Sequence, residues 1–472
     1  MQLKDMGAQI ARADGLDPGD SSVLEELFDV WRRQLPKNQR RDRYYLARVP
    51  VKDLGISVSP ELMAKISPRC DWAAKCVDWW ADRVQFDGFT CEDGNRLAAL
   101  EDIAWRNDLR NVTRKVTLCA LRHGVAFLTV TAGDPALAEP PVVVSGYPAT
   151  VASAVWDDTL KRVRAGMVVA ESERVRGTQQ RLPTLVHAFL RDCVISIRRA
   201  RGSSTWTAEY QEHSMGRPTF EPVAYHATLE RPFGRSRITS PVMWYVDEAQ
   251  REMANSCVAS AFSAMPQKFM MGVDREVGSA VAESRYEAYM GSVITATMNK
   301  KGGIPNFGQL PQISMQPHTD YFRSLAAGFS GVTGVPLSSL GVVSDNPSSA
   351  EAIYASKEDA VVDIQAYVDG LKVALRNVAL MALAATDGTD MAAAMAGPRV
   401  DVNYRNPAMP SVVSQSDAVT KQLAVLPWMG ESDVPLREFG YSDEQIRQLS
   451  AARAKSKTNE ALMSLAGLAG DE

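Results

Sequence analysis

The order of features between residues 240 and 386 constrains the fold of this chain more than any other part of its sequence. A helix is predicted over Ser240–Ala264, followed by a strand-and-helix excursion over 266–317 and a shorter helix over 321–329. A loop rich in Gly, Pro and Ser covers 331–349, and a very long helix is predicted over 348–386. Such a helix would span on the order of 50 Å, so it should reach across domains.

Cap signals and apolar spacing support the long helix. The run Ser348-Ser349-Ala350-Glu351 is a capping box directly after Pro347. A glycine at position 370 is a place where this helix could bend. The apolar stripe consists of Ile353, Ala360, Ile364, Tyr367, Leu371, Leu375 and Val378.

The first 125 residues favour helices, and the following segment favours strands. Helices are predicted over 21–35, ending at Pro36, then over 67–84 with Ser67 as N-cap, 96–107 and Leu109–His123. Alternating β-branched residues then predict a mostly antiparallel β region. Its strands are 125–131, 142–147, 151–156, 163–170, 185–191, 194–199 and 205–211. The fold class predicted is therefore α+β.

The C-terminal part is predicted to be a helical tail. A short extended piece over 399–404 precedes a helix over Val412–Val425, and a second capping box opens a helix over 442–455. Residues 456–472 are expected to be loosely ordered.

Size and composition indicate a folded protein of two to four domains. The chain has 472 residues, 45% of them apolar, and a formal net charge of −4. That charge argues against tight binding of DNA over the whole surface. The six cysteines include no Cys-x-x-Cys pair, so buried free thiols are expected. The N-terminal residues do not form a signal peptide, and the longest uncharged run, 324–344, is too rich in Gly, Pro and Ser for a membrane helix.

No motif of a catalytic or cofactor site is present. The sequence contains no phosphate-binding Gly loop, no His-Glu-x-x-His and no Gly-x-Ser-x-Gly. The five histidines, at 123, 187, 213, 226 and 318, have no second ligand at metal spacing. We therefore expect no catalytic residue, no cofactor and no metal, although dispersed carboxylates could still form a hydrolase site.

Two basic stretches stand out. The first, residues 32–48, holds seven Lys and Arg residues with Tyr44-Tyr45 among them, and we expect it to be a solvated loop that contacts another subunit. Nucleic-acid binding is the alternative. The second is Lys300-Lys301, which is expected on an exposed tip, with contact to DNA as the alternative.

Three stretches carry a family resemblance. They are Arg231-Pro232-Phe233-Gly234-Arg235-Ser236-Arg237-Ile238, Thr333-Gly334-Val335-Pro336-Leu337-Ser338-Ser339-Leu340-Gly341 and Ser348-Ser349-Ala350-Glu351-Ala352-Ile353. With the feature order described above, they resemble portal proteins of tailed bacteriophages, of the long-tailed type found in phages of actinobacteria. The resemblance covers residues 20–450.

The resemblance implies a division of the chain. Residues 1–236 would form a wing, 237–265 and 318–330 the two stem helices, and 266–317 a small α/β clip. Residues 331–347 would be the tunnel loop, 348–404 the long wing helix with its return strand, and 405–472 a crown. Residues of the tunnel loop would be Thr333, Val335, Pro336, Leu337, Ser338, Ser339, Leu340, Val342, Val343, Ser344, Asp345 and Asn346.

The resemblance also implies an assembly. Twelve copies would form a ring at one capsid vertex of the virion and pass double-stranded DNA during packaging and ejection. Partners would be the terminase large subunit, a head-tail adaptor, and the major capsid and scaffolding proteins, without a membrane. A channel for any sequence should grip phosphates weakly, and the tunnel loop, with Asp345 as its only charge, fits that need.

Two alternatives to a portal remain open on the sequence. One is another oligomeric virion component, such as an adaptor or minor capsid protein without a DNA channel. The other is an unrecognised hydrolase, which would have a defined pocket.

Overall fold

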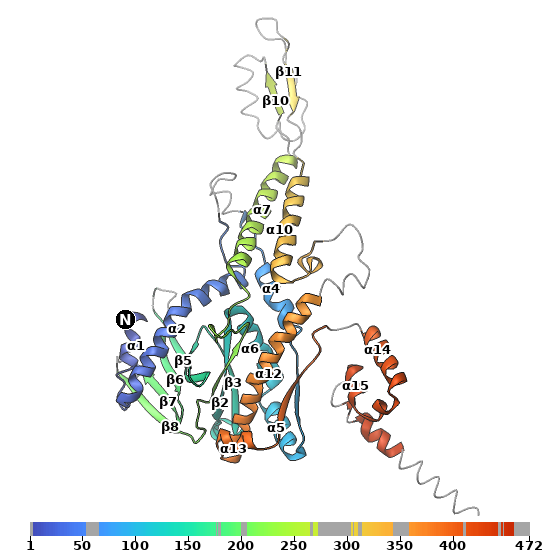
Figure 1. Cartoon of the computed structure of the whole chain (residues 1–472). Coiled ribbons are helices and arrows are strands. Elements are labelled where there is room, and N and C mark those ends of the chain that lie inside the picture. Colours follow the sequence, from blue (N-terminus) through green and yellow to red (C-terminus); the bar gives the residue numbers. More distant parts are fainter. Residues whose placement is uncertain are drawn as a thin grey trace, which may run out of the picture. The chain divides into compact units, whose positions relative to one another are not determined.

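The computed structural model describes residues 3–52, 66–175, 177, 181–199, 205–264, 268–271, 304, 306–309, 314–342, 358–408, 412–441, 445–446 and 448–456. The chain divides into two compact units, Met1–Pro407 and Ala408–Glu472. Within the described residues the fold mixes helices with antiparallel sheets, as predicted (Figure 1).

The N-terminal helices of the first unit are α1 (Leu3–Ile10), α2 (Pro18–Tyr45), α4 (Trp72–Ala81), α5 (Gly94–Arg106) and α6 (Leu109–His123). Among them, α6 has the predicted bounds and α5 lies within two residues of them, whereas α2 is longer and α4 shorter than predicted. The prediction that a helix ends at Pro36 is wrong, because α2 continues through it to Tyr45. The predicted loop over 32–48 is therefore mostly helix. The helix expected from Ser67 begins only at Trp72, since Ser67 has φ of +37°.

Two antiparallel sheets form the β region. The larger has the order β4-β5-β6-β7-β8 and the smaller β3-β2-β9, while β1 pairs with the distant β12. Strands β1 and β9 were missed from the sequence. The bounds are β1 Phe86–Cys91, β2 Val125–Ala132, β3 Val142–Pro148, β4 Ala152–Asp157, β5 Arg162–Arg174, β6 Arg181–Phe189, β7 Cys193–Arg199, β8 Trp206–Glu212, β9 Phe220–Ala224 and β12 Val400–Tyr404.

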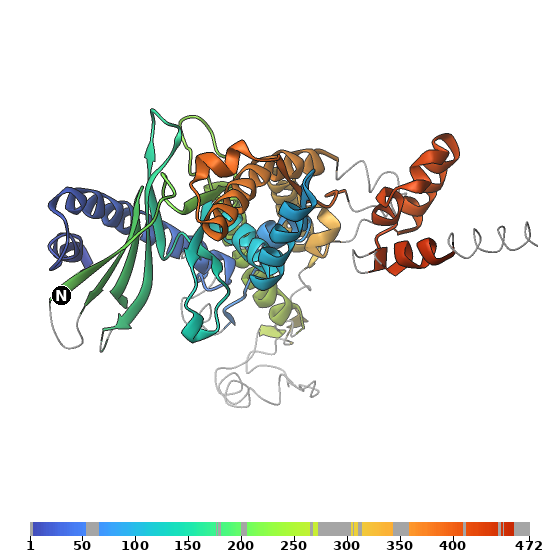
Figure 2. The ribbon, with the colours of Figure 1, turned by 90° about the horizontal axis from the view of Figure 1, so that it is seen from below.

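Strand β2 separates two cores because its side chains alternate between its faces. Ala126, Leu128 and Val130 belong to the main core, which they share with α4, α6, α7, α10 and α12. Phe127 points the other way, and its ring lies 4.8 Å from that of Phe220 in a small core between the sheets. A third core joins α1 and α2 to the five-stranded sheet, which they flank in Figure 2.

The long helices and the second unit follow the predicted order. Helix α7 spans Ser240–Ala264, α10 Gln316–Thr333 and α12 Glu358–Asp387, followed by α13 (Met391–Ala396). Residues 348–357, where the capping box lies, are outside the described residues. The second unit holds α14 (Val412–Val425), a 3₁₀ turn (Pro427–Glu431) and α15 (Val434–Glu438), and residues 448–456 are helical.

The cysteines and the apolar character of the helices were also predicted from the sequence. Cys70 and Cys76 are buried free thiols as predicted, but Cys257 is exposed, so that prediction is wrong for it. None of the described helices combines the length and apolar character needed to cross a bilayer.

Candidate functional site: a helical stem and its junction with the body

Helices α7 and α10 pack against each other as an antiparallel pair, which we call the stem. The body is the set of elements α1–α6, β1–β9, α12, α13 and β12. Tyr245, near the start of α7, lies against Phe329, near the end of α10, with ring centroids 6.4 Å apart. Gly328 allows this approach, because a Cβ at that position would lie 2.5 Å from the Tyr245 hydroxyl oxygen. The body holds the same end of the pair, since the Trp72 ring of α4 lies 5.2 Å from the rings of Phe322 and Phe329.

Buried carboxylates of α7 link the two helices by polar contacts. Glu252 is 6% exposed and accepts a contact from His318 Nδ1 at 2.6 Å. One turn earlier, Glu248 pairs with Arg251, and burial together with this nearby carboxylate raises the pKa of Tyr321 of α10. Burial of both carboxylates is tolerable because each has partners. This alignment fixes the register of the pair.

A third carboxylate ties α7 to the N-terminal region. Asp247 is 6% exposed, and its two carboxylate oxygens share the single hydrogen of the Tyr44 hydroxyl at the end of α2, each at 3.0 Å. Lys52 forms an ion pair with the same carboxylate, and this contact raises the pKa of the lysine. The second half of α2 is thus anchored at the base of the stem.

Arg237 joins four segments at the junction of stem and body. It precedes α7 and is 8% exposed. Its guanidinium donates to the carbonyl oxygen of Cys76, at 2.9 Å, to the Tyr225 hydroxyl, at 2.8 Å, and to the carbonyl oxygen of Thr333 at the end of α10. It also lies 3.5 Å from the centre of the Trp80 ring. The planar fork of arginine suits such a many-sided site.

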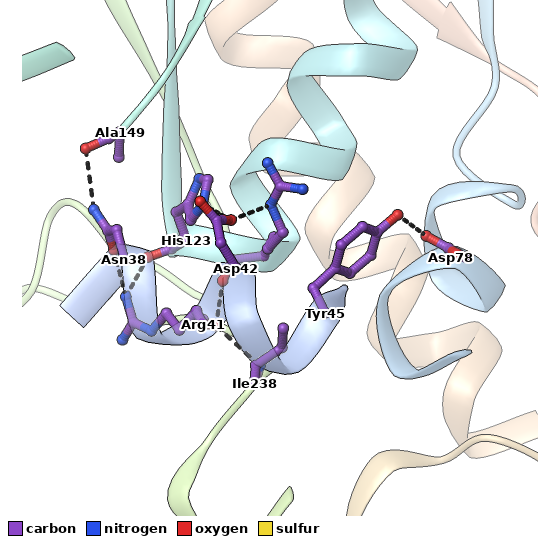
Figure 3. Close-up of polar contacts among 10 residues, drawn as sticks. Asn38, Arg41, Asp42, Tyr45, Asp78, His123, Ala149 and Ile238 are labelled. Atoms are coloured by element: carbon purple, nitrogen blue, oxygen red, sulfur yellow. Dashed lines mark hydrogen bonds and ion pairs between the residues drawn. The ribbon is translucent and has the colours of Figure 1, made fainter. Parts of the chain in front are cut away.

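A second polar cluster holds α2 against α6 (Figure 3). Asp42 lies 2.8 Å from His123 Nε2 and 3.0 Å from Arg122 Nε. Arg41 donates to the carbonyl oxygen of His123 at 2.6 Å, and Asn38 donates to that of Ala149 at 3.0 Å. Burial lowers the pKa of His123, although Asp42 acts in the opposite direction.

One cavity lies away from the stem, beside Tyr210 of β8. It has a volume of about 1050 Å³ and is lined by Asp17, Asp192, Cys193, Glu212 and His213, among others. Burial raises the pKa of the Cys193 thiol and lowers that of the His213 imidazole, so neither favours its charged form. In the part of the chain that the structure describes, no three His, Cys, Asp or Glu side chains are placed to hold a metal ion.

Comparison with known proteins identifies relatives that match nearly the whole chain. The portal protein of Mycobacterium phage L5 is 23% identical over 451 residues, covering 90% of this chain and 87% of its own length. That of Mycobacterium phage D29 is also 23% identical, covering 90% and 88%. The predicted resemblance to portal proteins of actinobacterial phages is confirmed.

No family model matches. A chain from the virion of a native gene transfer agent particle aligns with a TM-score of 0.46 and 11% identity, over 83% of this chain and 89% of its own. A chain from the neck of the native particle, computed with C12 symmetry, aligns with a TM-score of 0.43 and 12% identity over 80% and 89%.

The first half of the segment that was expected to be the tunnel loop is anchored to the body. The expected loop from 331 to 349 is helical through Thr333, where α10 ends, and forms a 3₁₀ turn at Leu337–Leu340. Gly334 caps α10 with φ of +68°. Val335 is fully buried, and Leu337, Leu340 and Val342 pack on the main core. Pro336, Ser338 and Ser339 lie in this anchored half, whereas Val343, Ser344, Asp345 and Asn346 are outside the described residues.

The structure describes only a few residues of 266–317, the segment that was expected to be the clip. Strands β10 (Lys268–Met271) and β11 (Asn306–Gln309) form an antiparallel pair that follows α7 and precedes α10 (Figure 1). Lys300 and Lys301 lie outside the described residues.

Sequence reasoning missed the residues that organise the stem. Arg237 belongs to a stretch that carried the resemblance, but nothing in its spacing predicts that it contacts Cys76, Trp80, Tyr225 and Thr333. The carboxylates at 248 and 252 are one turn apart on α7, and His318 and Tyr321 are one turn apart on α10. Matched helical spacing of acids with polar partners was therefore the available signal.

Proposed function

We propose that this chain is the portal subunit of a tailed phage. The observation that carries the proposal is the likeness to portal proteins of two mycobacteriophages over 90% of the chain. In this proposal twelve copies form a ring at one capsid vertex, and double-stranded DNA is packaged and ejected through its axis.

The antiparallel pair α7 and α10 suits the role of a stem. Its register is fixed by Glu252 with His318 and by Tyr245 against Gly328, and its base is fixed by Arg237. A rigid helical pair can hold the clip, residues 266–317, at a constant distance from the body. In this proposal the clip docks the head-tail adaptor and, during packaging, the terminase large subunit.

The tunnel loop is proposed as the part that meets DNA. Val335, Leu337, Leu340 and Val342 pack on the main core. We therefore propose that the following residues, 343–346, project into the channel. One acidic and three uncharged side chains at this place would contact passing phosphates weakly. Lys300 and Lys301 remain proposed DNA contacts of the clip. The wing, residues 1–236 and 348–404, and the crown, residues 405–472, would face capsid and scaffolding proteins.

Labelling of particles tests this placement in the virion. An affinity tag on the C-terminus of the chain should be found by electron microscopy at a single vertex of each particle, next to the tail. Label spread over the shell would instead favour a minor capsid protein, and label within the tail would favour an adaptor.

A further inference from the structure

Three cations form an exposed basic face on the second half of α2. Arg33, Lys37 and Arg40 follow one another at intervals of four and three residues, so they share one side of the helix. All three side chains are exposed, and among the described residues none forms an ion pair with a carboxylate. Arg43 is exposed on the adjoining side. These cations therefore have no partner of opposite charge in the described part of their own subunit.

The described part of α12 begins with an exposed acidic face. Glu358, Asp359 and Asp363 lie on the side of the helix that turns away from the core, and all are exposed. No described cation pairs with any of the three. Val362 and Val373 are exposed on the same side, at 62% and 48%. A charged helix face with unburied valines is typical of a surface that another protein covers.

The two faces carry opposite charge and lie on different sides of the first unit. The three cations extend over about 10 Å of α2, and the three carboxylates over about 8 Å of α12. Helix α2 packs against α4, α6 and the large sheet, whereas α12 packs against α5, α13 and β12. A chain with complementary faces on separate sides can assemble head to tail, and such contacts close into rings.

We propose that the basic face of α2 docks on the acidic face of α12 of a neighbouring copy of this chain. The inference rests on the proposed ring and assigns one of its contacts. Duplex DNA is the competing partner for the basic face. The acidic face favours a second copy, because binding of phosphates would need no surface of opposite charge on this chain.

Paired charge reversals test the contact. One variant, R33E/K37E/R40E, would present two acidic faces, and the other, E358K/D359K/D363K, two basic faces. Each alone should assemble at least about 100-fold more weakly than wild type, since like charges then meet at every contact. An equimolar mixture should restore rings with alternating subunits, which an even number of subunits permits. Mass photometry measures the assembly, and K161E/R191E/R399E controls for reversal of three exposed cations elsewhere.

The outcomes separate this inference from the proposed function. Rings formed by either variant alone, or no recovery in the mixture of two folded variants, would overturn the contact while wild-type rings still support a portal. If the first variant assembles normally but loses affinity for a fluorescent DNA duplex, the basic face binds phosphates and the inference is wrong. Failure of wild type to assemble would count against both proposals.

A covalent test does not depend on the triple variants folding. R40C/D363C in a C257S background, treated with a short bismaleimide, should give a ladder of linked subunits. R40C alone in that background is the matched control and should give no ladder. Absence of a ladder from assembled R40C/D363C rings would also overturn the contact.

Discussion

At the scale of single residues, Arg237 is the side chain on which the stem most depends. It is buried, and its hydrogen bonds reach α4, Tyr225 directly after β9, and the last turn of α10. Lysine would keep the charge but has one donor group in place of a planar fork, so it cannot serve all three acceptors. Unsatisfied carbonyl oxygens would be left in the core.

R237K should therefore destabilise the folded subunit by about 3 kcal/mol. Thermal unfolding followed by circular dichroism measures this. Arg110 is 65% exposed and pairs with Asp87 at 3.7 Å, so R110K is a matched control with little expected effect. Equal melting temperatures for R237K and R110K would contradict the assigned role.

Because His123 is buried, the free energy of unfolding should depend on pH in the acidic range. Burial lowers its pKa in the folded state below the ordinary value of 6.5. Below that pH the unfolded chain binds the proton more readily than the folded chain does. Stability should therefore be lost as pH falls from about 6.5 toward the lowered pKa, at up to about 1.4 kcal/mol per unit of pKa depression.

H123Q removes the titration of His123. Burial also lowers the pKa values of His187 and His213, but both are present in the variant and in wild type, so the difference between the two proteins reports His123 alone. The variant should lose less stability than wild type between pH 7.5 and 5.5 in parallel urea titrations. A steeper loss for H123Q would mean that Asp42 stabilises a charged imidazole and that the pKa of His123 is raised rather than lowered.

At the scale of elements, strong periodic segments could be predicted and weak ones could not. The bounds of α7 and α14 agree with the sequence, because apolar spacing and flanking proline mark them. Helix α2 passes Pro36 because tertiary bonds beyond it, from Asn38 to Ala149 and from Tyr44 to Asp247, offset a local cost of about 3 kcal/mol.

The missed strands have weak local signals. Strand β9 contains Pro222, which is tolerated because β9 is an edge strand paired only with β2. Strand β1 contains Gly88, and its partner β12 lies some 300 residues away, with Phe89 opposite Val402. Pairing at such a distance cannot be read from periodicity in a short window.

Two glycines of α10 provide a matched test of stem packing. In G328A the new methyl group would meet the Tyr245 ring, at 2.5 to 2.8 Å, so the variant should be destabilised by about 1–3 kcal/mol. In G331A the methyl group meets nothing within 4 Å, and the gain in helix propensity should stabilise by about 0.5–1 kcal/mol. Melting temperatures of unassembled subunits measure both. Similar shifts of the same sign would contradict the register of α10 against α7.

At the scale of the whole molecule, the feature order was more informative than any motif. The stem helices and the β region could be predicted from local patterns. The junction at Arg237 could not, because its partners Cys76, Tyr225 and Thr333 are far apart in the sequence and meet only in the fold. The segment that was expected to be the tunnel loop could be predicted less well. Its composition predicted a loop over 331–349, but Val335 is buried in the main core.

Deletion of residues 343–346 should leave rings intact and reduce the number of DNA-filled particles, because the anchored half of the loop is retained. Deletion of the exposed residues 135–138 between β2 and β3 is the control and should leave filling unchanged. Counting full and empty particles by electron microscopy gives the result. Normal filling after the first deletion would contradict the proposed tunnel loop.

The most direct test of the central claim is negative-stain electron microscopy of the purified protein with native mass alongside. We expect rotationally symmetric rings with an axial hole wide enough for duplex DNA, at about 620 kDa for twelve subunits of 51.6 kDa. Closed assemblies without an axial hole of that width would contradict the central claim and favour an adaptor or scaffold component.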